Sequence, residues 1–582
     1  MLTLPEGLTL HPSTPERGRS VRTTRAISAG STIATFSGTG PHSSPTIAIP
    51  DSSRLSETCS HCLRVSATLL NTLTSASNAV FSRTATIPST PPTTVPRGSV
   101  AEVRLCTGCK VSRYCSVACQ KADWALGHGK GECKAYKRAR LDAMKQGLPQ
   151  EMPTPVRTLI QVLVRPDMLD AVYETEGHEG EHRTAPGTRF FEMMLQVKAA
   201  LEYLGLKGEA DDVNIPKGLD VTCKLQVNSF NRLDSDFGQS GIYMNAALAM
   251  VNHSCIPNAY VSFTGRDGIL HAYQDIKEGE EVTISYSNCD IPRSERRHYL
   301  KTHYYFTCNC RRCQDDLDIY QTCQVYPNLE LNLSDPFSLV RDIDGLRNPP
   351  IKQFLSLNKS LQNNIAEILP IFETKLKFWD PVAMQQQVRH RWKLCAQLRT
   401  AGLYASDPLL RVLGDASLCF ARTGKHAYAF AIECFGALNI SPVISPAPFF
   451  ASRVKSMLML TRVLSLGPFS TPARSREEFA TRFAQHLSKV DQATMCQALL
   501  VAIIQYCPAA KSDEWQLRYQ AQDLLDDLKS LPGRETENAL VDAFAKNPNG
   551  PEERRFYNTV VVGPIQEVAG FALRIMEAEF GG

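Results

Sequence analysis

The pattern of apolar and polar positions divides the chain into a mixed front part and a helical rear part. Residues 1–50 and 225–290 carry short alternating apolar runs between glycine turns, which is typical of strands. Residues 150–222, and the chain after about residue 350, place apolar residues every three to four positions, as amphipathic helices do. We therefore expect an α+β front part interrupted by a helical segment, followed by an all-α C-terminal part.

Two segments far apart in the chain share the pattern x-Ile-x-x-Gly-x-x-(Ile/Val). They are residues 26–33 and 275–282, and each predicts a strand, a glycine turn and a second strand. The second segment continues through Val282, Ile284 and Tyr286, which alternate onto one face. We therefore expect Tyr286 at the end of a strand whose other inward residues belong to the core.

The stretch NHSCIPN, residues 252–258, crowds hydrogen-bonding side chains between apolar segments. Residues 246–251 before it are apolar, and residues 259–263 after it resemble a strand. A buried polar group costs free energy unless it is paired. The stretch is therefore either a turn whose polar groups are satisfied within the protein, or part of a ligand site.

The length and composition of the chain indicate how many domains it could form and in which compartment it is expected. The chain has 582 residues, enough for several domains, and its 43% apolar and 21% charged residues are ordinary for a soluble protein. The net charge of +4 identifies no partner, although residues 97–145 carry a local excess of +7. Because there is neither an apolar run of membrane length nor a signal-peptide pattern, we expect a soluble intracellular protein with no membrane partner. Residues 63–105 are rich in Ser, Thr and Pro, which predicts a disordered insertion.

The cysteines are concentrated in the front half of the chain. Fourteen of the 19 lie between Cys59 and Cys323, and disulfides are not expected in a reducing compartment. Four pairs have metal-ligand spacing and together supply ligands for two tetrahedral zinc ions: Cys59 and Cys62, Cys106 and Cys109, Cys115 and Cys119, His128 and Cys133. The alternative, unliganded buried cysteines, is disfavoured by the polar, basic surroundings. Five rear cysteines lie in apolar helical sequence and are expected in the core: Cys395, Cys419, Cys434, Cys496 and Cys507.

A third group of cysteines follows the second β-rich region. Cys308, Cys310 and Cys313 have the spacing Cys-x-Cys-x2-Cys, which is one ligand short of a closed structural zinc site. We expect Cys255 of NHSCIPN to be the fourth ligand, which makes three zinc ions in all. The alternative is a reactive or idle cysteine cluster.

The segment 106–133 resembles a MYND zinc finger in its cysteine spacing and in Tyr114, Gln120 and Trp124. In that family the ligand pairs interleave. The resemblance therefore implies one zinc held by Cys59, Cys62, Cys115 and Cys119, and another held by Cys106, Cys109, His128 and Cys133. The last pair departs from the family by one extra residue between its ligands, and His61 is a rival to His128.

The order of motifs over about residues 10–315 resembles the SET and MYND domain-containing protein-lysine methyltransferase family. Those motifs are Asn228-Ser-Phe230, NHSCIPN, Gly-Glu-Glu followed by Tyr286, and the Cys308–Cys313 run. The resemblance implies an α+β fold: a SET-domain β core interrupted by a MYND finger and a helical insert, then a cysteine-rich post-SET segment and an all-α, TPR-like C-terminal domain. The implied boundaries are 1–50 and 225–297 for the SET core, 51–135 for the finger, 136–224 for the helical insert, 298–320 for the post-SET segment and 321–582 for the C-terminal domain.

The resemblance also implies roles for individual residues. Tyr286 would be catalytic and would orient a lysine amine. The implied contacts of S-adenosyl-L-methionine are Arg17, Gly18, Arg19, Asn252, His253, Tyr286 and Phe306, and the implied substrate channel is Phe230, Tyr286 and Phe306. Ser20 stands where the family often has glycine. Residues 174–182 lie where relatives place a further cofactor contact, but we expect a solvated acidic loop there.

The implied function is S-adenosylmethionine-dependent methylation of lysines in histones or other proteins. The alternative is a weakly active or inactive scaffold that recruits protein partners in transcriptional regulation, with Pro-rich peptides bound by the finger. Nucleic acid binding through the basic segment is possible but ranks last. The expected location is the nucleus, the cytoplasm or both.

Overall fold

The computed structural model is organised as two compact units. It describes residues 3–14, 18–38, 44–66, 100, 102–149, 151–206, 211–234, 238–325, 335–374, 376, 380–466, 469, 478–507 and 516–581. The first unit comprises Met1–Leu73, Thr90–Ser287 and Arg297–Cys308, and the second comprises Thr74–Ser89, Asn288–Arg296 and Asn309–Gly582. Most of the predicted insertion at 63–105 lies outside the described residues, so that expectation stays a prediction.

The strands of the first unit form small sheets. They are β1 (Leu8–Thr14), β2 (Gly18–Thr23), β3 (Thr32–Phe36), β4 (Thr46–Pro50), β5 (Arg104–Leu105), β6 (Arg113–Tyr114), β7 (Phe230–Asp234), β8 (Gly238–Asn245), β9 (Asn252–His253), β10 (Ala259–Thr264), β11 (Asp267–Ala272) and β12 (Thr283–Ile284). The sheet orders are β1-β2, β10-β11-β3, β12-β9, β4-β8-β7 and β5-β6. Two of these sheets join strands from before and after the helical insert, namely β3 with β11 and β4 with β8.

The two segments that share the Gly-turn pattern pair with each other. Ile27 and Ile276 exchange both backbone hydrogen bonds at 2.9 Å. The turns contain Gly30 and Gly279 at φ +78° and +75°, a conformation that glycine adopts without a steric penalty. Val282 then donates its backbone N–H to the carbonyl of Val21. The end of the C-terminal segment is therefore fixed beside the N-terminal strand β2.

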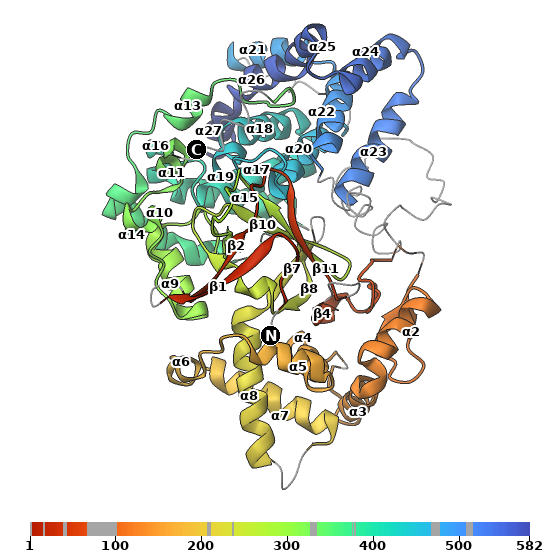
Figure 1. Cartoon of the computed structure of the whole chain (residues 1–582). Helices are drawn as coiled ribbons and strands as arrows, with labels where there is room; N and C mark the ends of the chain where they lie inside the picture. The colour runs from red at the N-terminus through yellow and green to blue at the C-terminus, as the bar shows by residue number, and fades with distance from the viewer. Residues whose placement is uncertain are drawn as a thin grey trace. The chain divides into compact units, whose positions relative to one another are not determined.

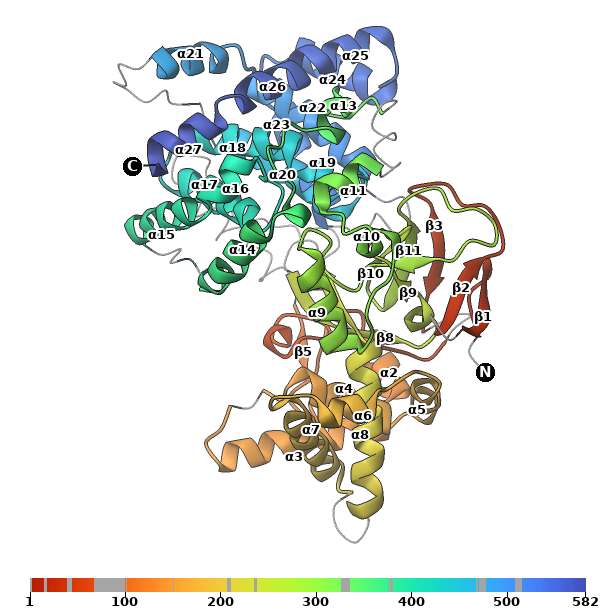
Figure 2. The same cartoon turned by 90° about the vertical axis from the view of Figure 1, so that its left-hand side faces the viewer.

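Helices separate the two groups of strands in the sequence of the first unit. They are η1 (Ser52–Arg54), α2 (Val117–Leu126), η2 (His128–Lys130), α3 (Glu132–Lys145), α4 (Thr154–Leu163), α5 (Pro166–Tyr173), α6 (Glu179–Thr184), α7 (Arg189–Leu204), α8 (Asp211–Asn228) and, after β8, η3 (Leu248–Met250). Figures 1 and 2 show α2 to α8 gathered on one side of the strands, with α7 and α8 next to each other. The helical pattern read for residues 150–222 is confirmed.

The second unit is helical in its described part. Helix α9 (Arg293–Tyr304) is divided between the two units, because residues from Arg297 belong to the first unit and those up to Arg296 to the second. Its helices are α10 (Arg311–Gln314), α11 (Ile319–Val325), α13 (Ile343–Arg347), η5 (Leu355–Leu357), α14 (Lys359–Phe372), α15 (Pro381–Leu394), α16 (Ala396–Ala401), α17 (Leu409–Arg422), α18 (His426–Asn439), α19 (Ser441–Ile444), α20 (Ala451–Leu464), α21 (Glu478–Leu487), α22 (Gln492–Tyr506), α23 (Gln516–Lys529), α24 (Glu535–Lys546), α25 (Pro551–Tyr557), η7 (Asn558–Val562), α26 (Gly563–Ala569) and α27 (Ala572–Phe580). The five rear cysteines are all buried here, which confirms their assignment to the core.

Neighbouring helices of the second unit pack in succession. Contacts join α15 to α17, α17 to α18, α18 to α20 and α20 to α22. By length and composition, the stretches His426–Ile444 and Pro551–Phe580 could cross a membrane, which the sequence analysis did not expect. About half of each apolar window is buried within the protein, namely 56% and 50%.

Candidate functional site

The stretch NHSCIPN is held in place by strand pairing. β9, which contains Asn252 and His253, pairs in parallel with β12, so that Asn252 lies opposite Thr283 and His253 opposite Ile284. Ser254 donates its backbone N–H to the carbonyl of Ile284 at 2.9 Å. This pairing brings the polar turn next to the segment that ends in Tyr286.

The polar side chains of this turn have partners within the protein. Asn252 donates through Nδ2 to the carbonyl of Arg19 at 2.8 Å and to Oε1 of Glu281 at 2.9 Å. Nδ1 of His253 accepts the backbone N–H of Tyr286 at 2.9 Å. The crowding of polar groups is therefore explained by a satisfied turn, and a ligand is not needed to account for it.

Asn258 is the most deeply buried polar residue of the turn, with 4% of its surface exposed. Its Oδ1 accepts the backbone N–H of Thr283 at 2.8 Å, and its Nδ2 donates to the carbonyl of Glu281 at 2.8 Å. One amide therefore joins NHSCIPN to the backbone that leads into Tyr286.

We expect Asn258→Ala to lower the free energy of unfolding by about 1 to 3 kcal/mol, because it removes the two hydrogen bonds that this buried amide makes to the backbone. Urea denaturation checks this value, with the exposed Asn363→Ala as the matched control. A loss no larger than that of the control would contradict the structural role of Asn258.

Tyr286 lies at the meeting point of an aromatic group. Its ring centroid is 5.3 Å from His253, 4.8 Å from Tyr304 and 6.5 Å from Phe306. Its hydroxyl donates to the carbonyl of Val251 at 2.6 Å. Burial raises the pKa of Tyr286 above its usual value, with further contributions from Tyr304 and Glu281, so the hydroxyl stays neutral at physiological pH.

The N-terminal strand β2 reaches this site through its backbone. The carbonyl of Arg19 accepts from Asn252, whereas its guanidinium donates to the carbonyl of Glu174 at 2.7 Å and lies 3.8 Å from the carboxylate of Glu176. Gly18 has φ +67°, with open space where a Cβ would be. Arg17 lies outside the described residues, so its predicted role stays a prediction.

Phe230 and Phe306 occupy different surroundings. Phe306 packs against His253 and Tyr286, with its ring centroid 5.9 Å from that of His253. Phe230 packs against Tyr243 and Phe263 at 6.5 and 6.2 Å. The contacts thus bring Phe306 to the aromatic group and place Phe230 on the neighbouring β7–β8 packing.

The acidic loop at residues 174–182 is only partly solvated. Glu174 and Glu176 are exposed but contact Arg19, and His182 is buried with 2% of its surface exposed. Nδ1 of His182 lies 2.7 Å from the hydroxyl of Tyr305. The expectation of a solvated acidic loop therefore holds for its glutamates but not for His182. Tyr305 stands between Tyr304 and Phe306, so this bond connects the loop to the aromatic group.

We expect the fold to lose stability as the pH falls from about 6.5 to 4. Burial lowers the pKa of His182 to about 4, helped by Arg189 and His178, so the unfolded chain takes up the proton first and the stability contribution is complete only above about pH 6.5. His182→Gln should reduce this dependence in thermal melts recorded from pH 4 to 7. It should not abolish it, because burial also lowers the pKa of His271 to about 4. An unchanged slope in His182→Gln would contradict the assignment.

Two further residues of this site were not singled out from the sequence. Glu281 accepts from Asn252, and Tyr304 packs on Tyr286. The Gly-Glu-Glu pattern could have indicated Glu281, because Glu281 lies two residues before Thr283, the strand partner of Asn252. Tyr304 ends a helix, and nothing in its local pattern separates it from Tyr299 or Tyr305.

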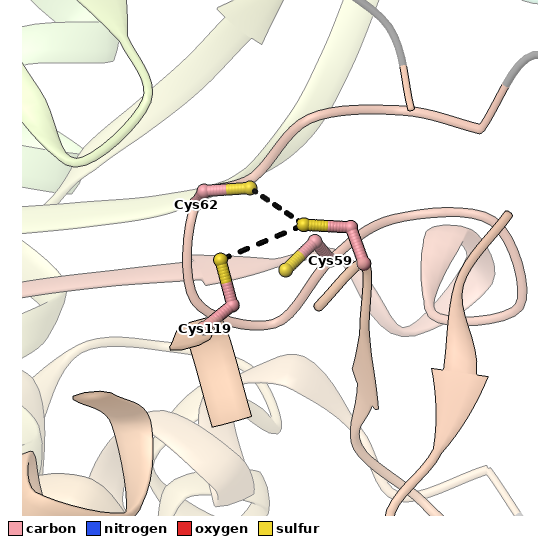
Figure 3. A group of neighbouring side chains, drawn as sticks. Cys59, Cys62 and Cys119 are labelled. Carbon is pink, nitrogen blue, oxygen red and sulfur yellow. Dashed lines mark hydrogen bonds between the residues drawn. The ribbon is translucent and has the colours of Figure 1, made fainter. Parts of the chain in front are cut away.

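The first cysteine group is Cys59, Cys62, Cys115 and Cys119. Their sulfur atoms all lie within 4.8 Å of one another. The sulfur of Cys115 is 3.6 Å from that of Cys62 and 3.5 Å from that of Cys119. Figure 3 shows Cys59, Cys62 and Cys119 turned toward one another. Four thiols around one point are the ligand set of a structural zinc site.

The second group is Cys106, Cys109, His128 and Cys133, whose ligand atoms also lie within 4.8 Å of one another. Nε2 of His128 is 3.7 Å from the sulfur of Cys109, and its Nδ1 is 3.7 Å from the carboxylate of Glu132. A carboxylate on the second ring nitrogen orients a histidine ligand. His61, the rival candidate, is instead 3.9 Å from the carboxylate of Asp123. The geometry therefore favours His128.

The third group is Cys255, Cys308, Cys310 and Cys313, again with all four sulfurs within 4.8 Å of one another. Cys255 also lies 3.3 Å from Nε2 of His253. The structure thus gathers all twelve predicted ligand residues into three groups that could each hold a zinc ion.

Comparison with known proteins identifies the class of domain. A family model described as the SET domain matches residues 18–287. Residues 18–287, which make up less than half of the chain, thus resemble a SET domain, and the described residues include three cysteine-rich groups that suit zinc.

Curated relatives narrow the class further. The chain is 32% identical over 212 residues to the SET domain and MYND-type zinc finger protein 6 of Schizosaccharomyces pombe, which covers 36% of this chain and 41% of the relative. It is 29% identical over 217 residues to the histone-lysine N-methyltransferase SMYD3 of Homo sapiens, covering 36% and 48%. It is 29% identical over 221 residues to the N-lysine methyltransferase SMYD2-A of Xenopus laevis, covering 36% and 47%. The match thus spans less than half the length of these relatives, and the predicted resemblance to the family of SET and MYND methyltransferases is confirmed.

Proposed function

We propose that the protein is an S-adenosylmethionine-dependent protein-lysine N-methyltransferase. The observation that carries the proposal is the position of Tyr286, hydrogen-bonded to His253 and next to the turn that holds Asn252. The names of two relatives, a histone-lysine and an N-lysine methyltransferase, support the same reaction class.

The residues around Tyr286 suit a sulfonium cofactor. S-adenosylmethionine supplies an electrophilic methyl group on a positively charged sulfur. The ring centroid of Tyr286 lies 4.8 Å from that of Tyr304 and 6.5 Å from that of Phe306. The faces of aromatic rings stabilise cations. We assign Gly18, Arg19, Asn252, His253 and Phe306 to the cofactor side. The backbone of Gly18 leaves room for close approach, and Arg17 is proposed from sequence alone.

Tyr286 is suited to orient the lysine amine. Its hydroxyl donates its hydrogen to the carbonyl of Val251. The lone pairs of the hydroxyl oxygen can therefore accept a hydrogen bond from an N–H of the amine. Aromatic and apolar walls disfavour the ammonium form, so they lower the pKa of the lysine and favour the neutral nucleophile. Phe306 is proposed as a wall of this channel. Phe230 is proposed as a channel residue from the sequence resemblance alone, because its ring packs on Tyr243 and Phe263.

We further propose that each of the three cysteine groups holds one zinc ion. The first two would form a MYND finger, and the third would close a post-SET segment. The proposed domains are the SET core at 1–50 and 225–297, the finger at 51–135, the helical insert at 136–224, the post-SET segment at 298–320 and a TPR-like domain at 321–582. The successive packing of α15, α17, α18, α20 and α22 supports the last of these.

The proposed substrate is an accessible lysine on a histone or another protein, in the nucleus or the cytoplasm. Pro-rich peptides are proposed as partners of the finger. The name of the relative SMYD3, a histone-lysine N-methyltransferase, supports testing histones first.

Calorimetry with S-adenosylmethionine, followed by transfer of a labelled methyl group to core histones and to a proteome extract, tests this function. Saturable cofactor binding with label on protein lysines is the expected result. Binding without transfer to any protein would favour the scaffold alternative. Failure to bind the cofactor at all would overturn the proposal.

A further inference from the structure

A groove lies between α3, α4 and α7 of the first unit, away from the site around Tyr286. Its volume is about 340 Å³, which is within the range of ligand-binding cavities. The three helices contact one another, and Figure 1 shows α3 beside α7. None of the described residues that line the groove belongs to a cysteine group or to the proposed cofactor site.

The floor and rim of the groove are apolar. Small side chains, Ala143 of α3 and Ala199 of α7, open the space between the helices. Leu148 and Leu195 line the rim and leave 55% and 50% of their surfaces exposed. Exposed leucines that border a hollow are typical of a binding surface. Because they extend the apolar surface to the mouth of the groove, they suit an extended ligand such as a peptide.

The charged groups that line the groove are acidic. They are Asp142 and Glu151, and the described lining residues include no lysine or arginine. Lys145 lies 3.6 Å from Asp142, but the lysine side chain is exposed and the carboxylate is partly exposed, so a ligand cation can replace the lysine at little cost. The groove therefore favours a ligand that carries positive charge next to apolar side chains.

One hydrogen-bond acceptor in the lining also points to a ligand. Oε1 of Gln196 is buried and has no hydrogen-bond partner among the described residues. A buried acceptor without a donor destabilises the folded protein. A backbone N–H or an arginine of a bound segment would remove that destabilisation.

We propose that this groove binds a short basic-apolar peptide segment of a partner protein. One or two apolar side chains occupy the space over Ala143 and Ala199, a lysine or arginine pairs with Asp142 and Glu151, and a donor reaches Gln196. This docking site is independent of methyl transfer, and a partner held here need not present the lysine that is methylated.

Fluorescence anisotropy with the full chain and no cofactor tests the proposal. The probe is a labelled peptide, Gly-Ser-Leu-Arg-Ala-Leu-Arg-Ser-Gly, compared with versions in which both arginines are glutamate or both leucines are alanine. We expect saturable binding of the first peptide, about tenfold weaker binding of each altered peptide, and no dependence on S-adenosylmethionine.

Two variants locate the binding. Asp142→Lys with Glu151→Lys should weaken binding of the arginine peptide about tenfold and improve binding of the glutamate peptide. Ala199→Phe should fill the groove and weaken both. The matched control is Asp170→Lys with Asp527→Lys, which changes the net charge equally at exposed positions outside the groove. Ala199→Phe can disturb the packing of the helices. The Asp142→Lys and Glu151→Lys variant changes only charged side chains at the rim, so its effect on binding does not depend on a change in the packing of the helices.

Three results would overturn the proposal. They are no saturable binding of the arginine peptide, equal binding of the arginine and glutamate peptides, or equal loss in the charge-reversal variant and its control. None of them bears on the proposed methyltransferase, which is measured by cofactor binding and label transfer.

Discussion

Tyr286→Phe is expected to lower kcat for lysine methylation by about 100-fold or more. The proposed role of the hydroxyl oxygen is to accept a hydrogen bond from the reacting amine, and loss of one oriented hydrogen-bonding group at a reacting centre costs about 2.7 to 4 kcal/mol. The phenyl ring keeps the contacts with His253, Tyr304 and Phe306, so we expect cofactor affinity to change by less than about threefold. Steady-state label transfer and calorimetry measure the two effects separately.

The same substitution removes the bond from Tyr286 to the carbonyl of Val251, which is expected to cost about 1 kcal/mol of stability. A thermal melt therefore accompanies the kinetics, so that a fall in kcat is compared among folded proteins. Tyr260→Phe is the matched control, because Tyr260 is another partly buried tyrosine, packed on His271 and Tyr273 rather than at the proposed site. Equal activity of Tyr286→Phe and Tyr260→Phe would remove Tyr286 from the mechanism.

Local sequence pattern was sufficient to predict features that depend on short residue spacing, namely metal ligands and strands. Eleven of the twelve ligand residues could be predicted because short spacings place two ligand atoms on one side of a turn. Their interleaved grouping was implied by the resemblance to the MYND family, and Cys255 was expected because the third group lacked a fourth ligand. Alternation placed Tyr286 near the end of a strand, although β12 ends at Ile284 and Tyr286 follows it by two residues. Spacing and alternation need only neighbours in the sequence.

Contacts between distant segments could not be derived in the same way. The bond between His182 and Tyr305 joins residues 123 positions apart, and Arg19 reaches Glu174 across 155 positions. Both contacts depend on how the helical insert packs on the strands. The periodicity of apolar residues within a segment does not determine that packing. The same holds for the polar turn, because the backbone partners of Asn258 are Glu281 and Thr283, which follow it by 23 and 25 residues. From the sequence, its amide could equally have faced a ligand.

The cysteine groups give the largest expected effect on structure. The folded chain is expected to contain three zinc ions, and Cys133→Ala is expected to leave two. Binding of a structural zinc contributes on the order of 10 kcal/mol to the folding of a small domain. Because residues 102–145 contain only short strands and helices around these ligands, loss of one ion should unfold the surrounding segment. Metal analysis gives the stoichiometry, and hydrogen exchange over residues 102–145 reports the unfolding.

Matched substitutions distinguish ligands from other cysteines and histidines. Cys419→Ala should keep three zinc ions, because Cys419 is buried in the helical second unit. His128→Ala should lose one ion, whereas His128→Cys should retain it, since zinc accepts four thiolates as readily as three thiolates and an imidazole. His61→Ala should retain all three, because His61 contacts Asp123 rather than the sulfur atoms. Loss of a zinc ion from His61→Ala, or retention of all three in His128→Ala, would indicate that His61 is the histidine ligand. Either result would contradict the group of Cys106, Cys109, His128 and Cys133.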